Sequence, residues 1–187
     1  PRIGTSSLFI QSSSSRYINT DFGNEVSFGL GIEAELILPF HNNKWGLLFE
    51  PTFQFYTSEK TTDVGFYLSG GKLISEVKYN YIEIPIGLRH YVFLTNNSKI
   101  FINASYVVSF NTKSSIELKR ADNSGVTSPD IETPLFNVAI GIGYKFNNKF
   151  GLEIRHQTNR EIFKNNLAWR SEYKTFSIIF SYSIFKK

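Results

Sequence analysis

The stretch VSFGLGIEAELILPF, residues 26–40, places an apolar residue at every second position. The apolar series is Val26, Phe28, Leu30, Ile32, Ala34, Leu36, Leu38 and Phe40. A period of two over fifteen residues predicts a β-strand with one apolar face. Strands of soluble proteins are usually about five or six residues long, whereas a membrane-crossing strand needs roughly 9–11 tilted residues. Recurrence of this pattern along the chain would therefore indicate a membrane barrel.

The alternation does recur, and it predicts eight strands. They span residues 3–13, 25–40, 45–57, 74–93, 98–111, 133–146, 149–159 and 173–185. Short Asn-rich turns (41–44, 94–97, 147–148) alternate with long polar segments (14–24, 58–73, 112–132, 160–172). An even strand count with short turns on one rim and long loops on the other is typical of outer-membrane barrels. We therefore expect both termini on the short-turn rim and the long loops outside the cell.

Two features weaken the pattern locally. Pro51 and Pro85 fall inside predicted strands, although proline cannot donate a hydrogen bond to the ladder. We expect bulges or gaps in the ladder at these two residues. The first strand is the least regular, because its apolar Leu8 and Ile10 stand beside several serines.

Composition excludes several classes of protein. A length of 187 residues predicts one domain, 1–187. Mean hydropathy is only -0.18 despite 18 Phe and 10 Tyr, and no run of about 18 apolar residues exists, which excludes a helical membrane protein. The absence of cysteine removes disulfides, thiolate catalysis and cysteine zinc sites. Net charge is +4 without a long basic stripe, so we expect no nucleic-acid partner.

The chain opens with Pro1-Arg2-Ile3, without Met and without a charged-then-apolar leader. Two interpretations fit this beginning. Either a signal peptide has been removed, or residues 1–187 are the C-terminal domain of a longer precursor.

The composition of the two strand faces predicts which one points outward. The non-apolar face carries glycines and charges of both signs, which suit the cramped interior of an eight-stranded barrel. The glycines are Gly29, Gly31, Gly46, Gly87, Gly141, Gly143 and Gly151. Bulky aromatics gather near strand ends on the apolar face, at Phe40, Trp45, Tyr144, Phe146, Phe150 and Tyr182. Such a girdle marks a lipid–water boundary, so the apolar face is predicted to lie outside.

The charged residues of the inward face are predicted to form an ion-pair network. Its members are Glu33, Glu35, Glu50, Glu83, Arg89, Glu153 and Arg155, with Lys145 as a further cation on this face. Buried charges are costly unless they are matched, so each arginine should contact a glutamate. Our hypothesis is that Arg89 neutralises part of the group Glu33, Glu35, Glu50 and Glu83. The predicted fold is an all-β, eight-stranded antiparallel up-and-down transmembrane barrel whose polar lumen is filled by side chains.

One stretch carries a family resemblance. Residues 81–91, YIEIPIGLRHY, precede an Asn-rich turn and the strand Ile100-Phe101-Ile102-Asn103-Ala104. With the Gly-rich residues 141–146 and the ending FSYSIF, 180–185, this resembles the outer-membrane β-barrel domain of Bacteroidota, the PorT-like porin family. The resemblance covers essentially the whole chain. It implies the fold, an outer-membrane location, insertion by the outer-membrane machinery and extracellular long loops, but it implies little about activity.

The sequence offers few candidates for chemistry. His41, His90 and His156 have no ligand partner at metal spacing, so neither a metal site nor a cofactor is expected. Ser171, Asp130 and His156 show no triad-like spacing, and ion pairing explains the carboxylates Glu33 and Glu35 more simply than acid–base catalysis. We therefore expect no catalytic residues.

The long segment 160–172 contains one candidate recognition group. An exposed tryptophan with arginine is typical of recognition surfaces, which makes Arg160, Trp169 and Arg170 candidates for loop recognition. The alternative is that Trp169 packs on the upper lipid boundary.

These observations predict a non-enzymatic outer-membrane barrel that serves as a membrane anchor or accessory subunit of a larger envelope complex. Its expected partners are outer-membrane lipid and other outer-membrane proteins. Two alternatives are a surface adhesin or ligand-binding barrel that acts through its long loops, and a small channel.

Overall fold

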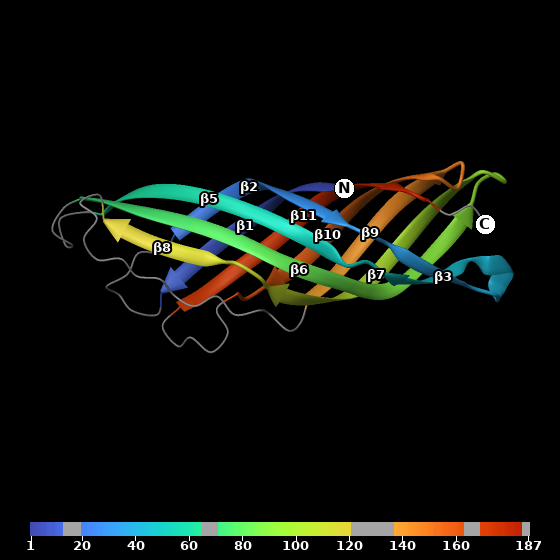
Figure 1. Ribbon diagram of the computed structural model, residues 1–187, viewed down its shortest axis with the longest axis horizontal. Helices are drawn as coiled ribbons and strands as arrows, with labels where there is room; N and C mark the ends of the chain where they lie inside the picture. The colour runs from blue at the N-terminus through green and yellow to red at the C-terminus, as the bar shows by residue number, and fades with distance from the viewer. Residues whose placement is uncertain (13–19, 65–70, 121–136, 163–168, 185–187) are drawn as a thin grey trace.

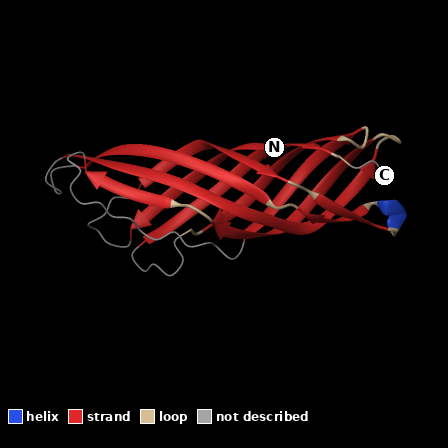
Figure 2. Ribbon diagram, viewed as in Figure 1, coloured by secondary structure: helices blue, strands red, loops and turns tan. Residues whose placement is uncertain are grey.

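The computed structural model is an elongated all-β structure (Figures 1 and 2), and it describes residues 1–12, 20–64, 71–120, 137–162 and 169–184. Its strands are β1 (Arg2–Ser12), β2 (Thr20–Gly31), β3 (Ala34–Leu38), β4 (Trp45–Phe49), β5 (Thr52–Val64), β6 (Gly71–Phe93), β7 (Ser98–Asn111), β8 (Ser115–Arg120), β9 (Asn137–Phe146), β10 (Phe150–Arg160) and β11 (Trp169–Tyr182). A single 3-10 turn, η1 (His41–Asn43), joins β3 to β4. Within the described residues, no helix is long and apolar enough to cross a membrane.

The strands close into a ring of eight. Its order is β1, β2, β5, β6, β7, β9, β10 and β11, and every pairing is antiparallel. Three shorter strands continue members of the ring along the chain: β3 follows β2, β4 precedes β5, and β8 follows β7. The first and last strands close the ring along a ladder that runs from Arg2 opposite Ile179 to Ser12 opposite Trp169. The predicted eight-stranded antiparallel barrel is therefore confirmed.

Both prolines accept a backbone hydrogen bond through their carbonyl oxygen, although neither has an amide to donate one. Between β4 and β5 the strand is interrupted at Glu50 and Pro51, and the Pro51 carbonyl accepts a 3.1 Å hydrogen bond from the Ile32 amide. Pro85 stays within β6, opposite Val107, and its carbonyl accepts a 3.1 Å bond from the Glu50 amide. The ladder gap expected at Pro51 is present, whereas β6 runs through Pro85 without a break.

Several predicted boundaries were wrong, and most strands extend further toward the long-loop end. β5 continues to Val64 where an end at residue 57 was expected, β2 begins at Thr20 and not at 25, and β11 begins at Trp169 and not at 173. The segment 112–132 also contains β8, which pairs with the first part of β6. Residues 133–136, assigned to the sixth strand from the sequence, lie outside the described residues.

Two bulges explain why the alternation fails toward the long-loop ends of β2 and β10. The β1–β2 register shifts between Ser7 and Phe9, next to Gly23, whose φ of 68° is left-handed. The β10–β11 register shifts between Gln157 and Arg160. One extra residue reverses which side chains point inward and which point outward along the rest of the strand. A strict period of two therefore stops at the bulge although the strand continues.

The barrel wall has two zones of opposite polarity. Around its short-turn part, large apolar side chains point outward, and Phe28, Phe49 and Ile140 are 55, 45 and 55 % exposed. At the long-loop end the apolar side chains point inward instead and form a cluster of ten residues: Leu8, Ile10, Phe22, Tyr56, Val77, Tyr79, Tyr81, Ile116, Ile162 and Tyr173. Leu8 and Ile10, which made the first predicted strand look irregular, belong to this inner cluster.

The position of β1 differs from the expectation. Arg2 pairs with Gly29 of β2 and Ile179 of β11, so β1 starts part-way along the wall, and β3 runs on beyond it toward the short-turn end (Figure 1). The N-terminal residue is therefore not on the short-turn rim, whereas the described C-terminal residues lie near it.

Candidate functional site: a charged lumen beneath an aromatic cap

The lumen is charged because the alternation along the strands turns their charged side chains inward. In β10 the residues Glu153, Arg155 and Gln157 alternate with Leu152, Ile154 and His156, and the first set is buried while the second is exposed. The same alternation turns Glu83 and Arg89 of β6 inward. The structure turns all seven residues of the predicted network inward and places each within an ion pair.

The group nearest the short-turn end is centred on Arg89. Its guanidinium makes two hydrogen bonds with the Glu33 carboxylate, at 2.7 and 3.0 Å, and lies 3.5 Å from Glu35. Lys145 donates to the Glu35 carboxylate at 2.9 Å, and the Tyr91 hydroxyl donates to it at 2.5 Å. Arg89 also stacks over the Phe101 ring, 4.2 Å from its centroid. A two-pronged ion pair of this kind fixes both side chains in one geometry.

The central group connects two arginines through one carboxylate. Arg155 donates to Glu153 at 2.5 Å and to Glu50 at 2.6 Å. Glu153 also accepts from Arg89 at 3.4 Å, which joins the central group to the previous one. The part of the glutamate group that Arg89 contacts, as our hypothesis required, consists of Glu33 and Glu35. Arg155 pairs with Glu50 instead, and Arg2 and Arg160 pair with Glu83.

The deepest group surrounds Glu83, which is 0 % exposed. Its carboxylate forms ion pairs with Arg2 and with Arg160, the latter at 3.7 Å. Gln157 donates to both of its oxygens at 3.0 and 2.9 Å, and Gln54 donates at 3.2 Å. Two cations and two amides therefore converge on one buried carboxylate.

Among the ion-paired side chains of the described lumen, acids and bases are equal in number. Five glutamates, Glu33, Glu35, Glu50, Glu83 and Glu153, face five cations, Arg2, Arg89, Lys145, Arg155 and Arg160. Since buried ions are costly unless paired, this equality lets the lumen be both polar and filled. The sequence prediction placed Lys145 on the inward face but not in the network. It did not include Arg2, although Arg2 lies on the inward face of β1.

The apolar cluster covers the long-loop end of this charged column. Four tyrosines pack edge to face or stacked: Tyr56, Tyr79, Tyr81 and Tyr173. Arg160 sits between the two layers, its guanidinium 4.6 Å from the Tyr81 ring centroid and 4.7 Å from that of Tyr173. The cation thus satisfies Glu83 on one side and aromatic faces on the other. Along its axis the described barrel passes from paired ions to packed rings.

We expect replacement of Arg89 by Leu to destabilise the folded barrel by about 2–3 kcal/mol, because Glu33 and Glu35 lose a charged donor. The effect should appear as a lower midpoint of heat unfolding, followed by gel mobility of the folded and unfolded forms. Arg170→Leu is the matched control, since Arg170 is exposed at the other end of the wall. Equal midpoints for Arg89→Leu and the parent protein would contradict the network.

The predicted recognition group is not a loop cluster. Arg160 ends β10 and is 3 % exposed in the lumen, because the bulge after Gln157 reverses its phase. Trp169 and Arg170 begin β11, opposite Ser12 and Gln11 of β1. Arg170 is exposed, and the side chain of Trp169 lies outside the described part of the structure. Arg160 and Arg170 nevertheless line one pocket together, with Phe9, Gln11, Glu161, Ser171 and Glu172.

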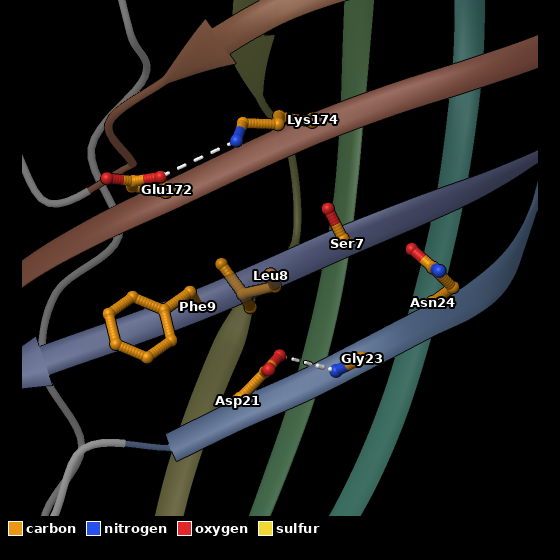
Figure 3. A pocket seen from close by; sticks show the side chains of 8 residues that line it. All are labelled: Ser7, Leu8, Phe9, Asp21, Gly23, Asn24, Glu172 and Lys174. Atoms are coloured by element: carbon orange, nitrogen blue, oxygen red, sulfur yellow. Dashed lines mark hydrogen bonds and ion pairs between the residues drawn. The ribbon is translucent and has the colours of Figure 1, made fainter.

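A shallow groove lies on the outer wall beside the bulge in β2 (Figure 3). Its lining comes from β1, β2 and β11 and comprises Ser7, Leu8, Phe9, Asp21, Gly23, Asn24, Glu172 and Lys174. Asp21 accepts a 2.8 Å hydrogen bond from the Gly23 amide, which fixes the left-handed turn, and Lys174 pairs with Glu172 at 3.7 Å. Similar acid–base pairs stand on β6, where Lys78 beside Glu76 lowers the pKa of that carboxyl, and on β8 between Lys119 and Glu117. The outer wall at this end is thus hydrated and of mixed charge.

The three histidines lie at the short-turn end or on the outer face of the wall. His90 packs against Trp45 with ring centroids 4.6 Å apart, and His41 against Phe40 at 5.6 Å. His156 is exposed on the apolar face of β10. Over the ranges that the structure describes, no group of three His, Asp or Glu residues is arranged to hold a metal ion.

Comparison with known proteins identifies the family. The family model described as outer membrane protein beta-barrel domain matches residues 1–159. The chain belongs to this family. It is a β-barrel protein of the bacterial outer membrane, as residues 81–91 and the strand pattern predicted. No curated protein matches the chain significantly.

Solved structures with a similar fold include proteins of different activities. The attachment invasion locus protein Ail of Yersinia pestis is 11 % identical with a TM-score of 0.38, over 96 % of this chain and 94 % of that one. Neisserial surface protein A is 10 % identical with a TM-score of 0.42, over 97 % and 95 %. The outer membrane enzyme PagL is 13 % identical with a TM-score of 0.41, over 96 % and 99 %. At this distance the likeness concerns the fold alone.

Proposed function

We propose that this outer-membrane barrel is a closed, non-enzymatic membrane anchor that serves as an accessory subunit of a larger envelope complex. The observation that carries the proposal is the filled lumen. Arg89, Arg155 and Glu83 are almost fully buried, and each is held by partners from other strands. A lumen occupied by five matched ion pairs and capped by aromatic rings leaves the protein its outer surfaces for interaction.

The outer surface supports contact with lipid. Exposed Leu, Ile, Val and Phe side chains surround the short-turn part of the wall, with Tyr144, Phe146, Phe150 and Tyr182 near its edge. An apolar band with an aromatic border matches the hydrocarbon layer and its interface. Outer-membrane lipid is therefore the first partner that we propose, and proteins that contact the wall beyond the band are the second.

Conductance tests the closed lumen. We expect the refolded protein to give no stepwise current in planar lipid bilayers, because charged side chains cross the lumen at three levels. A porin reconstituted in the same membrane is the positive control. Clear open steps from this protein alone would contradict the closed lumen and favour the small-channel alternative.

Co-purification tests the subunit role. Extraction in mild detergent, followed by size separation and protein identification, should recover the barrel with another envelope protein at fixed stoichiometry. The same extraction after exposure to a harsh detergent is the control for specific association. Recovery of the barrel as a monomer under mild conditions would count against the accessory-subunit proposal.

One observation favours a second candidate, a surface protein that binds ligands directly. The groove of Figure 3 places Phe9 beside Asp21 and Asn24 on the hydrated part of the wall. Aromatic and polar groups together are common in recognition surfaces. Phe9→Ser should weaken attachment of cells that display the barrel if this groove binds a ligand, whereas Arg170→Ser on the neighbouring β11 should not.

We also propose a finer placement of the chain, among the PorT-like proteins of Bacteroidota. Support comes from the string Tyr81–Arg89, in which Glu83 and Arg89 are lumenal ion-pair members and Pro85 accepts a hydrogen bond from the Glu50 amide. The residues that carry the resemblance thus have structural roles that related barrels would share.

A further inference from the structure

The three short turns of the barrel share one sequence pattern. Each places a lysine after a pair of asparagines, with one serine inserted in the second turn: Asn42-Asn43-Lys44, Asn96-Asn97-Ser98-Lys99 and Asn147-Asn148-Lys149. The turns join β3 to β4, β6 to β7 and β9 to β10, and they lie at the same end of the barrel (Figure 1). We call this end, with its lysines Lys44, Lys99 and Lys149, the short-turn mouth.

Turn geometry explains the asparagines but not the lysines. The asparagine pairs of the first and third turns have φ values of 57, 60, 52 and 50°, a left-handed conformation that asparagine tolerates. In the second turn the Thr95 hydroxyl accepts hydrogen bonds from the amides of Asn97 and Ser98, at 3.2 and 3.1 Å. Lysine side chains take no part in these contacts, so their charge needs another explanation.

The short-turn mouth carries positive charge that the lumen does not neutralise. Asp and Glu are absent from the residues that form this end of the barrel: 36–49, 90–102, 143–152 and 176–184. The carboxylates of the adjacent lumenal group, Glu33 and Glu35, already pair with Arg89 and Lys145. Within the part of the chain that the structure describes, the three lysines of the mouth form no ion pair.

Lys99 shows most clearly that this charge faces the lumen and not the lipid. It is half-buried and stands directly opposite Lys145 in the β7–β9 ladder. The Lys99 ammonium lies 4.1 Å from the ring centroid of Tyr91, and the Lys145 ammonium lies 5.6 Å from the same centroid. Tyr91 itself is fully buried. Because like charges directly opposite each other on a sheet are destabilising, a negative group in the mouth would relieve this repulsion.

We propose that the short-turn mouth is the docking site of an acidic polypeptide segment of a periplasmic partner. The proposal rests on the accessory-subunit function above and names the chemistry of the partner. Short turns of outer-membrane barrels face the periplasm. Carboxylates of the segment pair with lysines that three separate hairpins bring to one opening. A lipid headgroup fits this site less well, because the Lys99 ammonium turns toward the Tyr91 ring and away from the apolar outer face.

Binding of a fluorescent oligoglutamate peptide to the refolded barrel in a nonionic detergent tests the site. The mouth variant combines three substitutions: Lys44→Gln, Lys99→Gln and Lys149→Gln. The control variant removes the same charge from exposed positions at the long-loop end: Lys72→Gln, Lys113→Gln and Lys174→Gln. We expect the mouth variant to bind the peptide about tenfold more weakly than the parent protein. The control should change binding by about twofold or less, since it loses only long-range attraction.

Heat unfolding gives an independent readout for Lys99→Gln alone. This substitution removes the charge opposite Lys145, so the free variant should be at least as stable as the parent protein. Saturating oligoglutamate should raise the unfolding midpoint of the parent protein, because a ligand that binds the folded state stabilises it, and should raise that of the variant less. A lower midpoint of the free variant would show that Lys99 has a structural role and would overturn the assignment.

The other outcomes are equally distinct. Equal weakening of peptide binding by the mouth and control variants would reduce the effect to net charge and would overturn the proposal. Absence of peptide binding would also overturn it. If the parent protein, but not the mouth variant, then retained phosphatidylglycerol in preference to phosphatidylcholine, the mouth would be a lipid site. A barrel that binds oligoglutamate through these lysines but is extracted as a monomer would support the docking site and count only against the subunit role.

Discussion

Glu83→Gln should be the most damaging single substitution in the lumen, with a loss of about 3–5 kcal/mol from the free energy of unfolding. Gln keeps the volume of Glu but removes the charge. Arg2 and Arg160 would then remain buried, at 5 and 3 % exposure, without their shared carboxylate. Removing one partner of a buried ion pair is more harmful than removing both, because an uncompensated charge is left in a medium of low dielectric constant.

The measurement is urea unfolding of the protein in lipid vesicles, followed by intrinsic fluorescence. Glu76→Gln is the matched control on the same strand, since Glu76 faces the outer surface and pairs with the exposed Lys78. Surface ion pairs contribute about 0–1 kcal/mol, so this control should stay near the parent value. A loss below 1 kcal/mol for Glu83→Gln would show that the deepest group is not a stabilising centre.

Ile142→Lys should be the most damaging substitution on the outer face, with an expected loss of about 2–4 kcal/mol. Ile142 is 53 % exposed and lies in the middle of the apolar band, between Ile102 of β7 and Ile154 of β10. An exposed isoleucine in water tolerates lysine at little cost, whereas the same position in hydrocarbon must accommodate an ammonium group. The predicted loss therefore follows from lipid contact alone.

Thr57→Lys provides the control for this second prediction. Thr57 is also exposed on the outer face, but it lies beyond the band, next to Glu59. We expect this variant to fold and unfold like the parent protein in vesicles. Equal effects of the two lysines, measured by the same urea titration, would contradict the assignment of Ile142 to the lipid zone.

The pattern of period two was sufficient for the architecture, because lipid and a narrow lumen impose opposite demands on neighbouring residues. The runs 26–40 and 98–111 show this most clearly, and their outer and inner faces are those predicted. The lumenal members Glu33, Glu50, Glu83, Arg89 and Arg155 could be named for the same reason. The partners of each could not be named, since pairing depends on the stagger of strands that are distant in sequence.

The remaining errors have specific physical causes. Arg160 faces the lumen because a bulge reverses the phase of β10 after Gln157. Leu8 and Tyr79 face inward at the long-loop end, because the outer wall there meets water and the apolar side must turn away from it. β8 is short and its strand character depends on pairing with β6, which local sequence does not reveal. Alternation identifies a strand, but it does not locate the point at which the surrounding medium changes.

The central claim is that apolar side chains of the wall face lipid and that charged side chains face the barrel axis. Spin labels attached to single cysteines along β7 test it most directly, since the parent chain contains no cysteine. We expect high accessibility to oxygen dissolved in the lipid at Ile102, Ala104 and Tyr106, and low accessibility at Asn103 and Ser105. Uniform accessibility along these five positions, or an alternation of the opposite phase, would contradict the account.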